Sequence, residues 1–195
     1  MDLSSKSEFE SLTIQKQNFI EYDLKHKNFT QVTFDSCDFT KSDFTGSRFL
    51  ECKWIHSNLS LTKLDGCRIQ DALFENCKLV GLDFTRCEQR FLALQFKKCV
   101  ICMANFSDLP LKNTLFQGCK ILDTFFTNAN LTNADFEESD LKGTTFHNTN
   151  LTKANFCHAI NYSIHPATNT LSKARFSNPE VLSLLLALNI IIDEN

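Results

Sequence analysis

Glycine and proline are both scarce in this chain, which has five glycines and three prolines among 195 residues. These residues supply most tight hairpin turns, so their scarcity argues against a sheet made of many conventional hairpins. The chain also has no glycine/serine-rich or proline-rich linker and no low-complexity tract. Its composition therefore marks no boundary between domains.

Sequence motifs of catalysis are missing as well. There is no nucleophile elbow, phosphate-binding loop or metal-binding helix motif in the chain. The five histidines are scattered without a common partner, and we therefore expect no catalytic residue, no metal and no cofactor. The histidines are His26, His56, His147, His158 and His165.

The nine cysteines include no Cys-x-x-Cys pair, which argues against a zinc site. The polar N-terminus does not resemble a signal peptide, so we expect a cytoplasmic protein with free thiols that pack as small hydrophobes. A disulfide remains the alternative, because Cys77, Cys99 and Cys119 would lie about 4.8 Å apart in one column of a coil. The reactivity of Cys87 stays open.

What the chain does have is a large apolar residue at every fifth position. The series runs without a miss from Phe9 to Phe84 and resumes, displaced by two residues, from Phe91 to Phe156. A period of five matches neither the 3.6 residues of an α-helix nor the 2 residues of a flat strand. A coil that turns a corner every five residues can bury all these side chains.

The residue two places before each apolar centre is usually small, and the residue directly before it is mostly polar. Ala129-Asn130-Leu131 shows both features. This pattern, Ala-Asp/Asn-Leu/Phe-x-x, resembles the pentapeptide-repeat family and covers residues 7–158. The resemblance implies an all-β fold, a right-handed quadrilateral β-helix with four pentapeptides per coil and the centres stacked inside.

The two-residue displacement tests this reading, because residues twenty apart should share a column. Once it is allowed for, Phe74, Phe96 and Phe116 fall in one aromatic column, so the coil continues through the break. We expect one β-helix over residues 1–176, with an irregular last coil at 157–176 and a short corner insertion near 86–90. The corner residues of interest, which we expect to be extruded, are Arg86, Cys87, Glu88 and Arg90.

Residues 177–195 depart from the repeat and are expected to form a capping helix and a tail. Asn178-Pro179-Glu180 has the residues of a helix start, and the helix should run to about Leu188. A strand is expected at 190–192. The apolar run is too short to span a bilayer, so no membrane association is expected.

This helix is apolar on two sides, and one side is expected to close the coil while the other needs a partner. We therefore expect a homodimer, with a monomeric cap as the alternative. The resemblance favours the dimer, because quinolone-resistance proteins of the Qnr and MfpA type pair through their C-terminal ends. The candidate dimer interface comprises Val181, Leu182, Leu184, Leu185 and Leu188.

The resemblance also implies a function in binding. Proteins of the Qnr and MfpA type engage DNA gyrase or topoisomerase IV, in part as mimics of DNA, and protect these enzymes from quinolones or peptide toxins. No direct binding of nucleic acid is expected. One face of the coil carries a row of acids with only Lys25, Lys63 and Arg86 among them, and it is either an acidic binding face or an ordinary solvated face. This candidate acidic face comprises Asp23, Asp43, Asp65, Asp83 and Asp108.

The alternative function is an interaction scaffold for another cytoplasmic protein, without a topoisomerase role. The long loops of Qnr proteins from Gram-negative bacteria are missing here, which removes one argument for quinolone protection. Apolar residues on another face offer a second candidate surface. These residues are Leu61, Val80, Val100, Met103 and Leu122.

Overall fold

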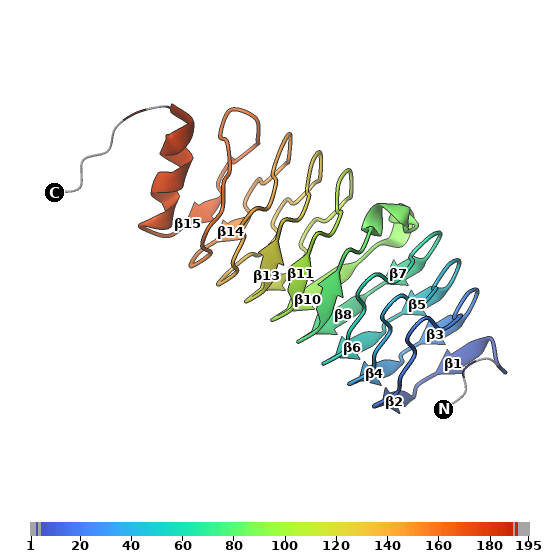
Figure 1. Cartoon of the computed structure of the whole chain (residues 1–195). Coiled ribbons are helices and arrows are strands. Elements are labelled where there is room, and N and C mark those ends of the chain that lie inside the picture. Colours follow the sequence, from blue (N-terminus) through green and yellow to red (C-terminus); the bar gives the residue numbers. More distant parts are fainter. Residues whose placement is uncertain (1–2, 4, 189, 191–195) are drawn as a thin grey trace.

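The computed structural model describes residue 3, residues 5–188 and residue 190. The chain winds into a right-handed quadrilateral β-helix, a parallel solenoid of about 8 turns that ends in one short helix (Figure 1). Ladder partners are twenty residues apart before residue 88, as for Phe29 and Phe49, and again after residue 94. The predicted all-β fold is thereby confirmed.

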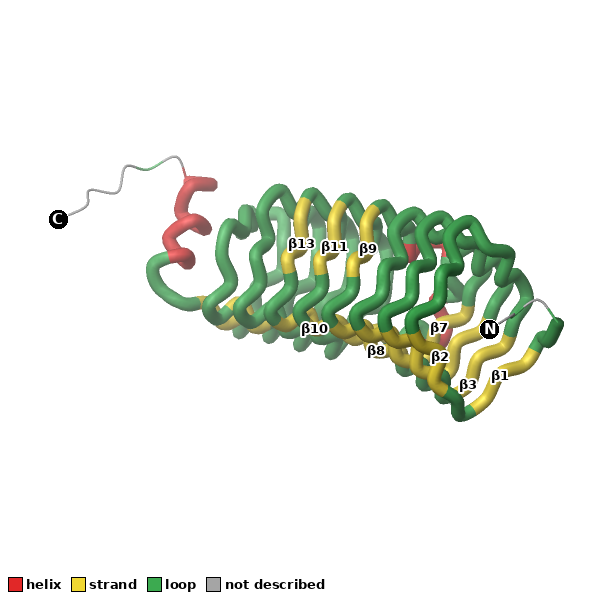
Figure 2. The backbone as a smooth tube through the Cα atoms, turned by 60° about the horizontal axis from the view of Figure 1, so that its bottom comes forward, coloured by secondary structure: helices red, strands yellow, loops and turns green. Residues whose placement is uncertain are grey.

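Four faces surround the interior, and three of them contain short parallel strands (Figure 2). Face A holds β1 (Glu8–Glu10), β3 (Asn28–Thr30), β5 (Arg48–Leu50) and β7 (Arg68–Gln70). Face B holds β2 (Thr13–Gln15), β4 (Thr33–Asp35), β6 (Lys53–Ile55), β8 (Ala72–Glu75), β10 (Leu94–Lys97), β12 (Phe116–Gln117), β14 (Asn155–Phe156) and β15 (Arg175–Phe176). Face C holds β9 (Lys78–Val80), β11 (Val100–Cys102) and β13 (Lys120–Leu122).

Face D is joined by isolated bridges, such as those of Asp43 with Asp23 and with Lys63. The 3-10 helices are η1 (Phe84–Arg86), η2 (Gln89–Phe91) and η3 (Glu180–Leu188). In a typical strand the central residue is buried and its two neighbours face outward, as for Phe29 in β3. One large side chain per strand therefore points to the axis, as the period of five predicts.

The corners explain how the coil turns with so little glycine. Nearly every corner has one residue with positive φ, and Ser11, Lys16, Glu21 and His26 form the four corners of the first coil with φ between 49 and 56°. All five glycines of the chain also occupy corners of this kind. Since each corner needs only one residue in the left-handed region, polar side chains can occupy most corners at a modest cost.

The interior is a set of stacked rings. In the column of Phe74, Phe96, Phe116, Phe136 and Phe156, successive ring centroids lie 4.9–5.2 Å apart with interplanar angles of 1–13°. Stacking persists across the break between Phe74 and Phe96, so the predicted continuity of the coil is confirmed. Because the rings fill the axis, a ligand has to bind on the outer faces.

The residues extruded at the break differ from those predicted. The regular register continues through Glu88, whose N–H donates to Cys67 O at 2.7 Å, and Cys87 is buried at 5% exposure. The extra residues are those of η2, which places Phe91 outside at 38% exposure, while Leu92 enters the core. The expectations of an extruded Cys87 and an inward Phe91 were wrong, because Cys87 occupies the small inward position twenty residues after Cys67.

The C-terminal segment begins and ends close to the predicted residues. Phe176 of β15 stacks on Phe156, with centroids 5.2 Å apart, and η3 follows at Glu180–Leu188. Leu184 packs against the core at the end of the coil. The strand expected at 190–192 lies outside the described residues except for Ile190, which is not in a strand. No helix in the described part of the chain is long and apolar enough to cross a membrane.

Candidate functional site

The five aspartates of the candidate acidic face do lie together on face D. Asp23 and Asp43 are bridge partners in adjacent coils, and Asp83 continues the row. However, bases stand among them: Lys25 Nζ lies 3.3 Å from an Asp23 oxygen and 3.9 Å from an Asp43 oxygen. Lys63 Nζ lies 3.8 Å from Asp43. The carboxylates at this end of the row are therefore largely neutralised.

Arg86, which was predicted as part of the corner loop, belongs to this face as well. Its Nε lies 3.9 Å from an Asp65 oxygen and 3.7 Å from an Asp83 oxygen. Asp108 has no basic partner within the described residues, and it accepts a hydrogen bond from Asn128 at 2.9 Å. Five aspartates and three bases leave this face with a net charge of −2.

Several of these carboxylates also have a local structural role. Oxygens of Asp23, Asp43 and Asp83 accept hydrogen bonds from the backbone N–H two residues later, at 3.0–3.1 Å. Partial burial tends to raise the pKa of Asp43, but hydrogen bonds from Thr45 and the charges of Lys25 and Lys63 outweigh it and lower the pKa. Such bonds satisfy turn N–H groups. Aspartate in these positions therefore has a structural explanation without a ligand.

The outward apolar residues form a continuous surface, which we call the apolar stripe. Leu61 and Met103 are corner residues of face C with 51% and 57% exposure, and Val100 of β11 is 38% exposed. Leu61 N–H donates to Val80 O at 2.8 Å, and a methyl of Leu61 lies over the Gly81 corner of the next coil. The stripe comprises Leu61, Val80, Val100, Cys102, Met103, Leu122 and Phe125.

Two members of the stripe were missed in the sequence. Cys102 joins Val80 and Leu122 as their ladder partner. Phe125 is 48% exposed although a polar residue is expected directly before the centre Phe126. The signal that could have found it is a pair of adjacent phenylalanines, since only one of two neighbours on a strand can face inward.

The predicted corner residues do not form a common site. Cys87 is buried, and burial raises the pKa of its thiol well above the usual value, which keeps it protonated and unreactive. Arg90 turns toward face A, with its guanidinium carbon 5.2 Å from the centre of the Phe91 ring. Glu88 lies exposed between them.

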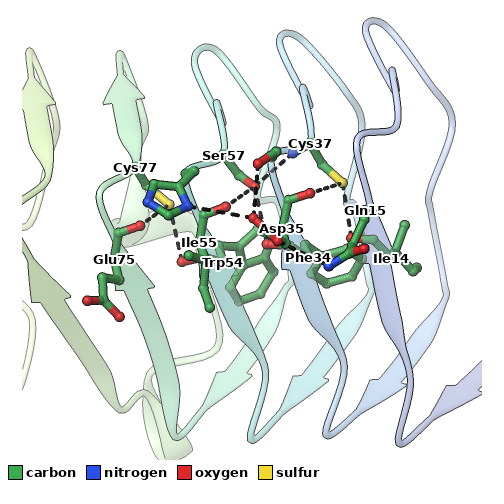
Figure 3. A network of polar contacts seen from close by, with 12 residues as sticks. Ile14, Gln15, Phe34, Asp35, Cys37, Trp54, Ile55, Ser57, Glu75 and Cys77 are labelled. Carbon is green, nitrogen blue, oxygen red and sulfur yellow. Dashed lines mark hydrogen bonds and ion pairs between the residues drawn. The ribbon is translucent and has the colours of Figure 1, made fainter.

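All nine cysteines are free, and the seven buried ones occupy the small inward position. Figure 3 shows this position in three coils: Cys37 Sγ, Ser57 Oγ and Cys77 Sγ each lie 3.2–3.4 Å from the carbonyl oxygen of a centre 23 residues earlier. Burial raises the pKa of Cys52 to about 11 and that of Cys67 to about 12. No group of three or more potential metal ligands occurs among the described residues.

The residues of the candidate dimer interface divide between two sides of η3. Val181, Leu184 and Leu185 are half-buried, and Leu184 contacts the core. Leu182 and Leu188 are 45% and 63% exposed. The most exposed side chain of the helix is Leu186, at 75%, which the predicted interface omitted. The side available to a partner is therefore centred on Leu182 and Leu186.

Comparison with known proteins agrees with this architecture. A family model described as the pentapeptide repeat region matches residues 27–95 and 89–159. A search of curated proteins finds no significant match. Among solved structures, a trypsin-treated variant of QnrB1, described as a plasmid-mediated fluoroquinolone resistance protein, is 14% identical with a TM-score of 0.74, covering 95% of this chain and 100% of that one. A second trypsin-treated QnrB1 variant is 15% identical with a TM-score of 0.58, covering 96% and 92%. At these identities the likeness concerns the fold alone.

Proposed function

The chain belongs to the pentapeptide repeat family, and we propose that it is a non-enzymatic cytoplasmic protein that serves as an interaction scaffold for another protein. The apolar stripe carries this proposal. Leu61, Val100, Met103 and Phe125 are 38–57% exposed, and they are spread over four coils of the rod. Contiguous exposed apolar surface on a soluble protein is typical of an interface with another protein.

The shape of the fold supports the same reading. The strands of face C hold Val80, Cys102 and Leu122 in one row, and the bridges of face D hold Phe125 at its border. A partner can therefore bind without ordering a loop, and the entropic cost of association is reduced. The matching surface on the partner should be apolar and extended along about four coils, which corresponds to roughly 15 Å at the strand spacing.

The test uses aspartate substitutions that introduce charge into the stripe. The double variant Leu61→Asp, Met103→Asp should fold normally, because both side chains are more than half exposed. Pull-down from the native host should lose the partner, with binding weakened by tenfold or more in order of magnitude. The control variant Asn76→Asp, Asn113→Asp adds the same charge at exposed corners of other faces and should retain the partner. Equal recovery with both variants would contradict a role for the stripe.

A second candidate function is binding of DNA gyrase or topoisomerase IV, giving immunity to a quinolone or a toxin. It is favoured by the likeness of the rod to QnrB1 over nearly its whole length and by the single row of aspartates on face D. The five ion-pair contacts within that row weigh against it. The scaffold is therefore the function that we favour.

We also propose that the protein forms a homodimer through the exposed side of η3. A helix with Leu182, Leu186 and Leu188 exposed at 45–75% leaves a large apolar area in water. A second copy of the same helix would cover it symmetrically, as two-fold interfaces do.

A further inference from the structure

A hollow with a volume of about 560 Å³ lies on face A, on the opposite side of the coil from the apolar stripe. Its lining comes from all four strands of that face, and the segments around the buried centres Phe9, Phe29 and Phe49 lie beneath it. The segment that carries η2 bulges out of the coil beside β7, the strand at one end of the hollow (Figure 1). A volume of this size is in the range of binding pockets.

The end of the hollow near η2 is strongly basic. Arg48 and Arg68 are register partners on the parallel strands β5 and β7, so their backbones lie about 4.8 Å apart. Arg68 places its guanidinium carbon 4.0 Å from the centre of the Phe91 ring, and Arg90 approaches the same ring at 5.2 Å. Two guanidinium groups therefore lie against the Phe91 ring, and Arg48 adds a third positive charge on the neighbouring strand.

These arginines have no internal counter-charge. In the part of the chain that the structure describes, none of the three has a carboxylate within ion-pair distance. Like charges that face each other across a ladder are destabilising. Face D shows the contrast, because its bases lie beside acids. Arg68 donates to the neutral amide oxygen of Gln70 at 3.3 Å, so its charge stays uncompensated. Arg48 and Arg68, which line the hollow, are suited to bind carboxylates, for which the planar guanidinium has matching geometry.

The opposite end of the hollow is acidic. Glu8 and Glu10 flank the buried Phe9 on β1, three strand spacings or about 14 Å from β7. A nucleic-acid strand carries a negative charge at every phosphate and would be repelled by these glutamates. An extended peptide of four or five residues spans the same length and can carry unlike charges at its two ends. Leu50 adds an apolar contact in the middle of the hollow.

We propose that the hollow on face A binds a short acidic segment of a partner protein, with its carboxylates at Arg48 and Arg68 and a basic or neutral side chain near Glu8 and Glu10. Phe91 is a positioning residue that holds Arg68 over the hollow. The site does not depend on the apolar stripe, because the two lie on opposite faces.

The experiment measures fluorescence anisotropy of labelled pentapeptides with the full chain. The probe has the sequence Lys-Ala-Leu-Asp-Glu, and the comparison peptide replaces both acids by their amides. We expect binding of the acidic probe only, weakened at high salt because exposed charges are screened. Arg48→Gln with Arg68→Gln should weaken it by about tenfold or more. The control Arg175→Gln removes an exposed arginine from β15, outside the hollow, and should leave binding unchanged.

A second variant tests the proposal even if the double arginine variant fails to fold. Phe91→Ala removes a partly exposed ring without touching the strands and should weaken the probe by a smaller factor, with an unchanged melting temperature. No binding of the acidic probe at about 1 mM would overturn the proposal. Equal binding by the arginine variants, or stronger binding of a single-stranded oligonucleotide than of the peptide, would overturn it as well.

Discussion

At the scale of the residue, two positions in each pentapeptide specify the coil. The centre supplies the buried side chain, and the small residue two places earlier lets the backbone approach the axis. When that small residue is Ser, Thr or Cys, its side chain often bonds to the preceding coil, as Thr62 Oγ1 does to Phe39 O at 3.0 Å, although the buried hydroxyl of Ser42 has no partner. Alanine needs no such partner. This is why Ala, Ser, Thr and Cys replace one another at this position, and it accounts for the seven buried cysteines without a metal or a disulfide.

Adjacent phenylalanines provide a matched test of the centre. Phe126 is fully buried and stacks on Phe106 and Phe146, whereas Phe125 is 48% exposed. We expect Phe126→Ala to lower the free energy of unfolding by about 3–5 kcal/mol, because it leaves a cavity in the ring stack. Phe125→Ala should cost less than about 1 kcal/mol. Chemical denaturation followed by circular dichroism gives both values, and similar losses for the two variants would contradict the assignment of the inward position.

The period of five was enough to predict the ring columns, including Phe96 above Phe116. It could not show which residues leave the coil at the break. Counting in fives places Phe91 inside and Leu92 outside, whereas the structure has the reverse. Nor could it show that Lys63 and Arg86 reach the aspartates of face D, because ion pairs depend on side-chain conformation. The pair Arg48 and Arg68 was overlooked, although both directly precede a centre and are twenty residues apart.

At the scale of the element, a corner is determined by the residues next to it in the sequence, whereas the C-terminal helix depends on residues far away in the sequence. A corner needs one residue in the left-handed region and is specified within five residues. The helix η3 depends on the coil that it covers, because Leu184 has to find the end of the ring stack. No described residue covers its other apolar side, where Leu182, Leu186 and Leu188 are exposed.

Dimerisation through η3 can be tested with two substitutions on its exposed side. Leu182→Asp with Leu186→Asp should convert a dimer into a monomer, because two charges would be buried without partners in the interface. Light scattering measures the mass, and circular dichroism should show intact β-structure since neither side chain supports the coil. The variant Lys173→Asp, at an exposed corner of the last coil, serves as the control. An unchanged mass for the double variant, or a wild type that is already monomeric, would count against this interface.

At the scale of the whole molecule, the rod presents different chemistry on each face. Face A has the arginine hollow, face C the apolar stripe and face D the paired aspartates. Each coil contacts only its neighbours, so the register of twenty residues alone aligns these groups along the rod. A rod of about eight coils is roughly 38 Å long, and a DNA duplex of that length carries about twenty negative charges. Face D, at −2, reproduces little of that field.

This difference in charge leads to a prediction for the second candidate function. We expect purified DNA gyrase to retain its supercoiling activity, with the same sensitivity to a quinolone, when the protein is added at micromolar concentration, because electrostatic mimicry needs a dense row of unpaired carboxylates. Protection from the quinolone would instead favour topoisomerase binding over the scaffold. The variant Asp108→Asn would then show which surface binds the enzyme. Asp108 has no basic partner among the described residues, and an asparagine at this position can still accept the hydrogen bond from Asn128. Loss of protection in that variant would assign face D, and full protection would direct attention to the apolar stripe, where Leu61→Asp with Met103→Asp should abolish it.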